Sequence, residues 1–165
     1  MKKNIGKNIL EGLLFILIIS SCNNYNSTSE AGFNFIFTWG IMDDSSVNTY
    51  NKTYTQALDW DNDTTIMFKF SEKEMNEIFR LIKKYEIDHY PELFIPTTSR
   101  FQSPQDSFFL EYQYDNITKK VLWDINGLSQ TRDAKKLRKI FNRIISYVQK
   151  DERIRNLPDS KRAYL

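Results

Sequence analysis

The 165-residue chain carries 23 basic residues, 21 acidic residues and a single cysteine. Its length provides enough apolar surface for one hydrophobic core and too little for two ordinary domains, and a lone cysteine excludes a disulfide within the chain. The first 21 residues hold three lysines and one glutamate, so residues 22–165 carry 20 basic and 20 acidic residues, a balance that gives no argument for nucleic-acid binding.

The first 21 residues have the order of an export signal. Lys2, Lys3 and Lys7 precede seven consecutive apolar residues, Leu13 to Ile19, and two serines follow. This apolar run is too short to cross a membrane, because a spanning helix needs about 20 apolar residues. We therefore predict that residues 1–21 are a signal peptide.

The residues at the end of this run, Ile19-Ser20-Ser21-Cys22, resemble the lipobox of bacterial lipoproteins. The resemblance implies cleavage before Cys22, a diacylglyceryl group on its thiol and acylation of the new amino terminus. Two or more acyl chains hold a protein stably on a membrane. The asparagine after the cysteine resembles an outer-membrane sorting signal, if the host has two membranes. Two alternatives stay open, namely a secretory signal with an incidental cysteine and an uncleaved anchor.

The segment that follows the cysteine predicts a flexible tether. Residues 22–31 are mostly small and polar and have no periodicity. When fully stretched, a tether of this length reaches about 30 Å. We expect residues 32–165 to form a single domain that can stand off the membrane without moving far from it.

Three strands are predicted at the start of this domain. Large apolar residues alternate with other residues from Phe33 to Trp39, which is the period of a strand with one buried face. Residues 47–58 are rich in threonine and tyrosine and predict a second strand. The alternation from Thr64 to Phe70 predicts a third.

A helix is predicted directly after the third strand. Ser71 and Glu74 have the spacing of a capping box, in which each side chain accepts a hydrogen bond from the other residue's backbone N–H. Apolar residues then recur at helical spacing and form one stripe: Met75, Ile78, Phe79, Ile82 and Tyr85. Pro91 and Pro96 prevent the helix from continuing.

The rest of the chain predicts a hairpin, with strands near 108–114 and 119–124, and a clear amphipathic helix over 132–150. The order β-β-β-α-β-β-α predicts an α+β fold, in which an antiparallel sheet of about five strands is covered on one face by two amphipathic helices. This layout also resembles that of small uncharacterised bacterial envelope lipoproteins. That resemblance carries no catalytic residues.

One face of the last predicted helix is basic and lies opposite its apolar arc. It comprises Arg132, Lys135, Lys136, Lys139 and Arg143. A solvated helix surface explains such a run. The sharper alternative is a face for an anionic partner, such as phospholipid head groups or an acidic polymer, because residues 119–165 carry 13 basic and 5 acidic residues.

Asp59, Asp61 and Asp63 occupy the first three ligand positions of a calcium loop. However, Thr64 stands where such a loop needs glycine, and Phe70 stands where it needs a bidentate glutamate. A polar turn closed by Asx-type hydrogen bonds is the preferred interpretation. We expect no metal site and no cofactor.

The three tryptophans raise the hypothesis of a sugar-binding surface, since flat rings stack on the apolar faces of sugars. Trp39 and Trp123 end alternating apolar rows and are expected in the core. Only Trp60 is expected near solvent.

These observations favour a lipid-anchored envelope protein whose domain binds or braces an envelope protein or an anionic polymer and performs no chemistry. The one histidine, His89, has no partner motif, and no glycine pattern for phosphate binding is present. An alternative is an inhibitor or immunity-type lipoprotein. In that case the segment 22–118, in which acidic residues outnumber basic ones, would meet a basic active site. The least favoured class is an enzyme that uses paired carboxylates, such as Asp43 with Asp44 or Asp59 with Asp61.

Overall fold

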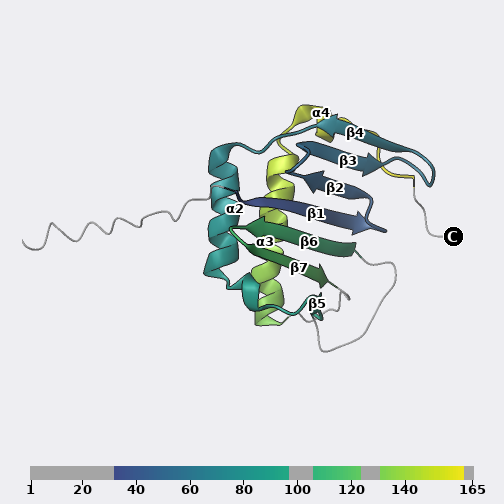
Figure 1. Cartoon of the computed structure of the whole chain (residues 1–165). Helices are drawn as coiled ribbons and strands as arrows, with labels where there is room; N and C mark the ends of the chain where they lie inside the picture. Colours follow the sequence, from purple (N-terminus) through teal and green to yellow (C-terminus); the bar gives the residue numbers. More distant parts are fainter. Residues whose placement is uncertain (1–31, 97–105, 124–130, 162–165) are drawn as a thin grey trace, which may run out of the picture.

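The computed structural model describes residues 32–96, 106–123 and 131–161, which form a seven-stranded sheet with helices on one face (Figure 1). The order across the sheet is β4-β3-β2-β1-β6-β7-β5. Neighbouring strands pair antiparallel except β5 and β7, which are parallel. The strands are β1 (Asn34–Ile41), β2 (Ser45–Asn48), β3 (Thr53–Ala57), β4 (Asp63–Met67), β5 (Leu93–Phe94), β6 (Asp106–Tyr114) and β7 (Ile117–Trp123).

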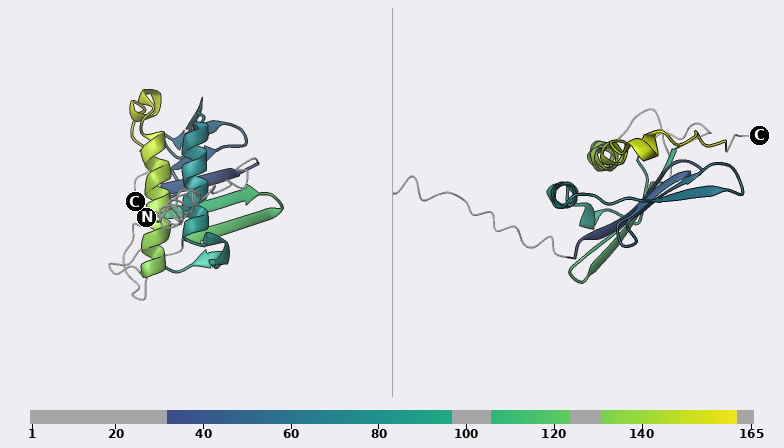
Figure 2. Two further views of the ribbon diagram at one scale, coloured as in Figure 1. Left: turned by 90° about the vertical axis from the view of Figure 1, so that its left-hand side faces the viewer. Right: turned by 90° about the horizontal axis from the view of Figure 1, so that it is seen from above.

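Two long helices, α2 (Glu72–Lys84) and α3 (Arg132–Val148), lie side by side across one face of the sheet (Figure 2). The predicted capping box starts α2, because Ser71 Oγ accepts from Glu74 N at 3.3 Å and Glu74 Oε2 accepts from Ser71 N at 3.0 Å. Thr131 Oγ1 caps α3 by accepting from Ala134 N. Two short helices, η1 (Ile87–His89) and α4 (Glu152–Arg155), follow α2 and α3.

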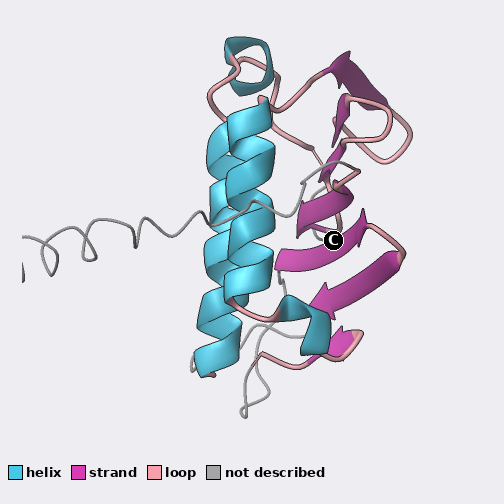
Figure 3. Ribbon diagram, turned by 60° about the vertical axis from the view of Figure 1, so that its left-hand side comes forward, coloured by secondary structure: helices cyan, strands magenta, loops and turns pink. Residues whose placement is uncertain are grey.

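The hydrophobic core fills the space between the sheet and the two helices (Figure 3). Alternation along β1 turns Phe35 and Phe37 toward the helices, where both side chains are fully buried. Phe141 of α3 stacks on Phe37 with 5.0 Å between ring centroids. The core residues within the described ranges run from Phe33 to Ile154.

The α+β class is confirmed, whereas the prediction of about five antiparallel strands was wrong. Residues 47–58 are two strands rather than one, because Asn48 Oδ1 accepts from Asn51 N at 3.1 Å and Lys52 adopts a φ of 55°, which closes a turn between β2 and β3. The second missed strand, β5, makes the sheet mixed. The short helix α4 was also not predicted.

Candidate functional site

An open cleft of about 480 Å³ lies where α3 ends over the sheet, and we call it the Trp39 cleft. Its volume is within the range of small-ligand sites. Its sheet side is formed by Trp39, Ser45, Tyr54 and Gln56, and its other side includes Gln149, Arg155 and Asp159. The cleft therefore combines aromatic rings with amide and charged side chains.

Trp39 lies at the boundary between the core and this cleft. Its ring stacks on Phe37 at 5.1 Å and 16° and lies 6.0 Å from the ring of Tyr54. Phe37 is fully buried, whereas Trp39, two residues further along β1, is only partly buried. The expectation that Trp39 is buried in the core was therefore wrong, whereas Trp123 is buried as expected.

Hydrogen bonds hold the polar side chains of the cleft in place. Tyr54 Oη donates to Gln56 Oε1 at 2.8 Å, and Gln56 Nε2 donates to the carbonyl of Pro158 at 2.7 Å. Burial raises the pKa of Tyr54, so its hydroxyl stays protonated. Lys161 N also donates to the carbonyl of Leu58 at 2.7 Å. The segment after α4 is thus fastened to β3, and the cleft is preformed.

The predicted basic face of α3 is less uniform than its sequence indicates. Lys136 pairs with Asp133 at 2.8 Å, and Arg143 Nε pairs with Glu77 of α2 at 3.0 Å. The hydrogen bond from Lys136 lowers the pKa of Asp133. The other three members of the face, Arg132, Lys135 and Lys139, are exposed. The structure therefore assigns Arg143 to the contact between the helices, which leaves fewer cations for a partner.

The Asp59–Asp63 segment is closed by its own hydrogen bonds. Asp59 Oδ1 accepts from the backbone N of Asp61 at 3.0 Å and of Asn62 at 2.9 Å. The Asn62 amide also donates to both Asp59 carboxylate oxygens, which lowers the pKa of Asp59. These are the Asx-type hydrogen bonds expected of a polar turn at this segment. The described ranges contain no group of three or more histidine, cysteine, aspartate or glutamate residues placed to hold a metal.

A half-buried carboxylate at η1 was not recognised in the sequence. Asp88 accepts from Tyr112 Oη at 2.7 Å, from Tyr114 Oη at 2.6 Å and from Lys83 Nζ at 3.0 Å. Burial opposes ionisation of Asp88, but these hydrogen bonds outweigh it and lower its pKa. Burial and the Asp88 carboxylate raise the pKa of Tyr112. This cluster connects the end of α2 to β6 and does not line the Trp39 cleft.

Two other residues considered in the sequence, Trp60 and His89, are exposed. Trp60 is 55% exposed, as expected, but does not line the Trp39 cleft. His89 is exposed at the end of η1. Cys22 and the predicted tether, residues 22–31, lie outside the described residues.

Comparison of the sequence with protein-family models gives no match, and comparison with curated proteins gives none either. Within the described residues, no helix has both the length and the apolar character needed to cross a membrane.

Proposed function

We propose that this chain is an exported lipoprotein of the cell envelope, held to the membrane by lipid on Cys22, whose domain binds another envelope component. The order of lysines, apolar run, small residues and cysteine supports the anchor. Because β1 starts at Asn34, about ten residues would separate this strand from the lipid, a reach of about 30 Å. The folded domain would work close to the membrane surface.

The Trp39 cleft is the observation that carries the binding role. An aromatic ring with amide, carboxylate and guanidinium groups around it suits a sugar, whose apolar face stacks on the ring while its hydroxyls meet the polar groups. Gln56 and Tyr54 are already fixed by hydrogen bonds, so little side-chain entropy is lost on binding. We therefore propose a saccharide unit of an envelope polymer as the ligand of the cleft.

A non-catalytic role is supported by two observations on the perturbed titratable groups: Tyr54 lines the Trp39 cleft but its pKa is raised away from neutrality, and Asp88 and Tyr112 lie elsewhere. Asp88 and Tyr112 have shifted pKa values because they bond to each other inside the fold, away from the Trp39 cleft. Catalytic acids and bases are instead expected in a cleft with their pKa values tuned toward neutrality.

Titration of the protein with oligosaccharides released from the host envelope tests this binding. Trp39→Ala is expected to weaken binding about tenfold or more through loss of stacking. Trp60→Ala is the matched control, because Trp60 is exposed and lies outside the cleft. Equal loss in both variants, or no loss in Trp39→Ala, contradicts the assignment.

The inhibitor alternative is favoured by one feature, the acidic turn between β1 and β2. Met42 and Asp43 have φ values of 56° and 57°, and Ser107 Oγ donates to Asp43 Oδ1, so the turn is held in one conformation. Met42 is 45% exposed. A preformed exposed turn of this kind suits insertion into an enzyme cleft.

Partner capture from envelopes separates the two candidates. Loss of the partner in Asp43→Asn but not in Trp39→Ala favours the inhibitor, since asparagine tolerates the left-handed backbone and only the charge is removed. The reverse pattern favours the saccharide-binding role.

A further inference from the structure

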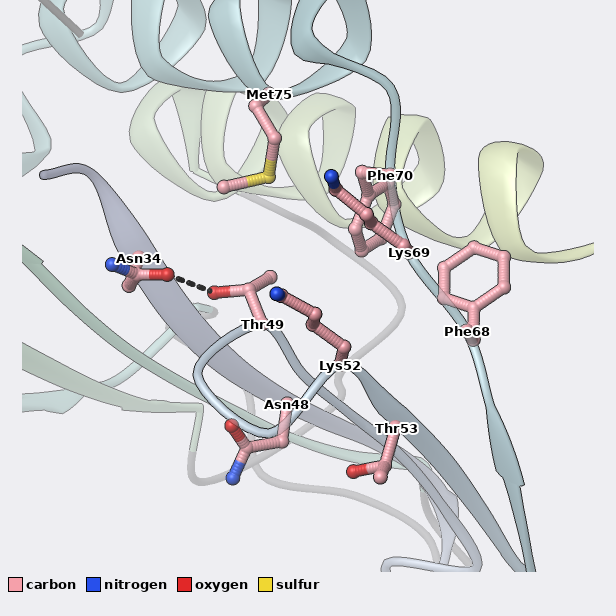
Figure 4. A pocket seen from close by; sticks show the side chains of 9 residues that line it. All are labelled: Asn34, Asn48, Thr49, Lys52, Thr53, Phe68, Lys69, Phe70 and Met75. Carbon is pink, nitrogen blue, oxygen red and sulfur yellow. Dashed lines mark hydrogen bonds between the residues drawn. The ribbon is translucent and has the colours of Figure 1, made fainter. Parts of the chain in front are cut away.

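A second cavity, of about 140 Å³, lies between the β2–β3 turn and the start of α2, and we call it the lysine pocket. Two of its lining residues are Lys52, in that turn, and Lys69, just before α2. Figure 4 shows both ammonium groups pointing into the space between Thr49 and Met75. A cavity of this size accommodates a phosphate group and a small part of the molecule that carries it.

The two lysines bring uncompensated positive charge to this pocket. Neither Lys52 nor Lys69 forms an ion pair with any residue in the ranges that the structure describes. Like charges that converge on one cavity repel each other, and an anion between them removes that repulsion. The charge pattern therefore points to an anionic ligand.

Two neutral polar side chains of the pocket are already engaged within the fold. Thr49 Oγ1 accepts from Phe35 N at 2.8 Å and donates to Asn34 Oδ1 at 3.1 Å. Asn34 Nδ2 in turn donates to the carbonyl of Gly32 at 3.3 Å. These bonds fix Asn34 and Thr49 in the pocket wall. The two ammonium groups are the charged donors that the pocket offers to a ligand.

The remaining wall is apolar and formed by Phe68, Phe70 and Met75. An inorganic ion gains nothing from such a wall, whereas a phosphate ester with a carbon skeleton buries part of that skeleton against it. Tyr50, in the same turn as Lys52, is 41% exposed. Tyrosine and lysine together are typical of protein surfaces at the level of lipid head groups.

The pocket also lies close in sequence to the predicted anchor. Asn34 lines it and is bonded to Gly32, the first described residue. If Cys22 carries lipid, the pocket is within about 30 Å of the membrane surface along the chain. The far end of β1 can lie further from the membrane by the length of the strand.

We propose that the lysine pocket binds the phosphate of an anionic lipid head group and so turns this end of the domain toward the membrane. The phosphate chemistry follows from Lys52, Lys69 and the apolar wall. The choice of a lipid as its source rests on the proposed anchor at Cys22.

The test uses residues 22–165 with Cys22→Ala, so that the protein carries no lipid and the described core is intact. Its co-sedimentation is measured with vesicles of phosphatidylcholine alone and of phosphatidylcholine with phosphatidylglycerol. Lys52→Gln/Lys69→Gln replaces each ammonium group by a neutral amide, one atom closer to the backbone, and so removes both charges. Lys135→Gln/Lys139→Gln removes the same charge from the exposed face of α3.

The pocket variant is expected to lose at least about tenfold in affinity for the phosphatidylglycerol vesicles, and the α3 variant less than about twofold. Equal loss in the two variants indicates diffuse attraction by surface charge and overturns the proposal. Absence of any preference for the anionic vesicles overturns it as well.

A second experiment distinguishes binding of a phosphate group from binding of a lipid that carries it. Titration with glycerol 3-phosphate, followed by amide NMR shifts of Thr49 and Lys69, is expected to saturate in the parent protein and not in the pocket variant. Binding of this ester without vesicle binding retains the phosphate site and rejects the lipid source. Because none of these proteins carries lipid, a negative result bears on the pocket and leaves the Cys22 anchor to its own test.

Discussion

The two ends of β1 carry cavities of opposite chemistry. Asn34, at the start of the strand, lines the lysine pocket, and Trp39, five residues later, lines the Trp39 cleft, a separation along the strand of about 17 Å. The difference arises from the segments that line each cavity. The β2–β3 turn and the residues just before α2 bring two lysines to Asn34, whereas the end of α3 and the segment that follows it line the cleft at Trp39. One end is cationic, and the other is aromatic and polar.

The largest expected effect is a difference in unfolding free energy between substitution of the buried Phe37 and substitution of the partly exposed Trp39. Phe37→Ala should lower the free energy of unfolding by about 3–5 kcal/mol, because Phe37 is fully buried and contacts Trp39, Phe108 and Phe141. Trp39→Ala should lower it by only about 1–2 kcal/mol, because this ring is already partly exposed. Urea unfolding measures both values. If the two losses are equal, Trp39 is a core residue and not a binding surface.

Gly32, just before β1, and Gly40, near its end, allow the same substitution to be compared at two positions. Gly32 and Gly40 have φ values of 96° and 97°, so alanine is strained at both positions. A Cβ at Gly40 would also lie 2.1 Å from Asp44 Oδ1, whereas a Cβ at Gly32 would meet nothing within 4 Å. Gly40→Ala should therefore cost about 2–3 kcal/mol and Gly32→Ala about 1 kcal/mol. Similar losses in thermal or urea unfolding would show that the turn at Asp44 adapts.

The stability of the fold at acid pH depends on the Asp88 cluster, which lies at neither of the two cavities along β1. The folded-state pKa of Asp88 lies below its ordinary value of 3.8, so its stabilising contribution is complete above that pH and is lost as the pH falls through the folded-state pKa. Asp88→Ala also leaves the buried Tyr112 hydroxyl without its acceptor, and should cost about 1–3 kcal/mol at pH 7. The difference between parent and variant should shrink below about pH 4. Asp61→Ala, at an exposed position, is the control for urea unfolding at each pH. A loss that does not change with pH would contradict this role.

The smallest expected effect concerns the lysine pocket itself. Lys52→Gln/Lys69→Gln should change the free energy of unfolding by no more than about 0.5 kcal/mol, because both side chains are exposed and form no ion pair within the described residues. Urea unfolding beside Lys135→Gln/Lys139→Gln measures this. A large loss in the pocket variant alone would mean that these lysines stabilise the fold and would remove the reason to assign them a ligand.

Local signals in the sequence were enough to predict the main helices and the β6–β7 hairpin. Ser71 and Glu74 each accept a hydrogen bond from the backbone N–H of the other, so these two residues suffice to predict where α2 begins. The β2–β3 turn was missed because threonine, tyrosine and asparagine continue through it without a break in pattern. The two-residue strand β5 shows no alternation, and its pairing with β7 joins Leu93 to Leu122 across 29 positions of sequence.

The candidate sites depend on contacts between residues that lie far apart in the chain, and the sequence alone does not show these contacts. Trp39 continues the alternating row of β1, so the pattern does not distinguish it from the fully buried Phe35 and Phe37. Lys52 and Lys69 lie 17 residues apart and are brought together by the pairing of β3 with β4. The Asp88 cluster likewise joins residues that are 24 and 26 positions apart. The lysine-rich face of α3 was conspicuous in the sequence, yet Arg143 is paired with Glu77.

The intact mass of the protein purified from host membranes tests the central claim of lipid anchoring most directly. The account predicts a chain that begins at Cys22 and carries the added mass of a diacylglyceryl group, with or without a further acyl chain. It also predicts that Cys22→Ala removes the protein from the membrane fraction. A mass equal to the full 165 residues, or to a chain cleaved elsewhere and free of lipid, would contradict the account.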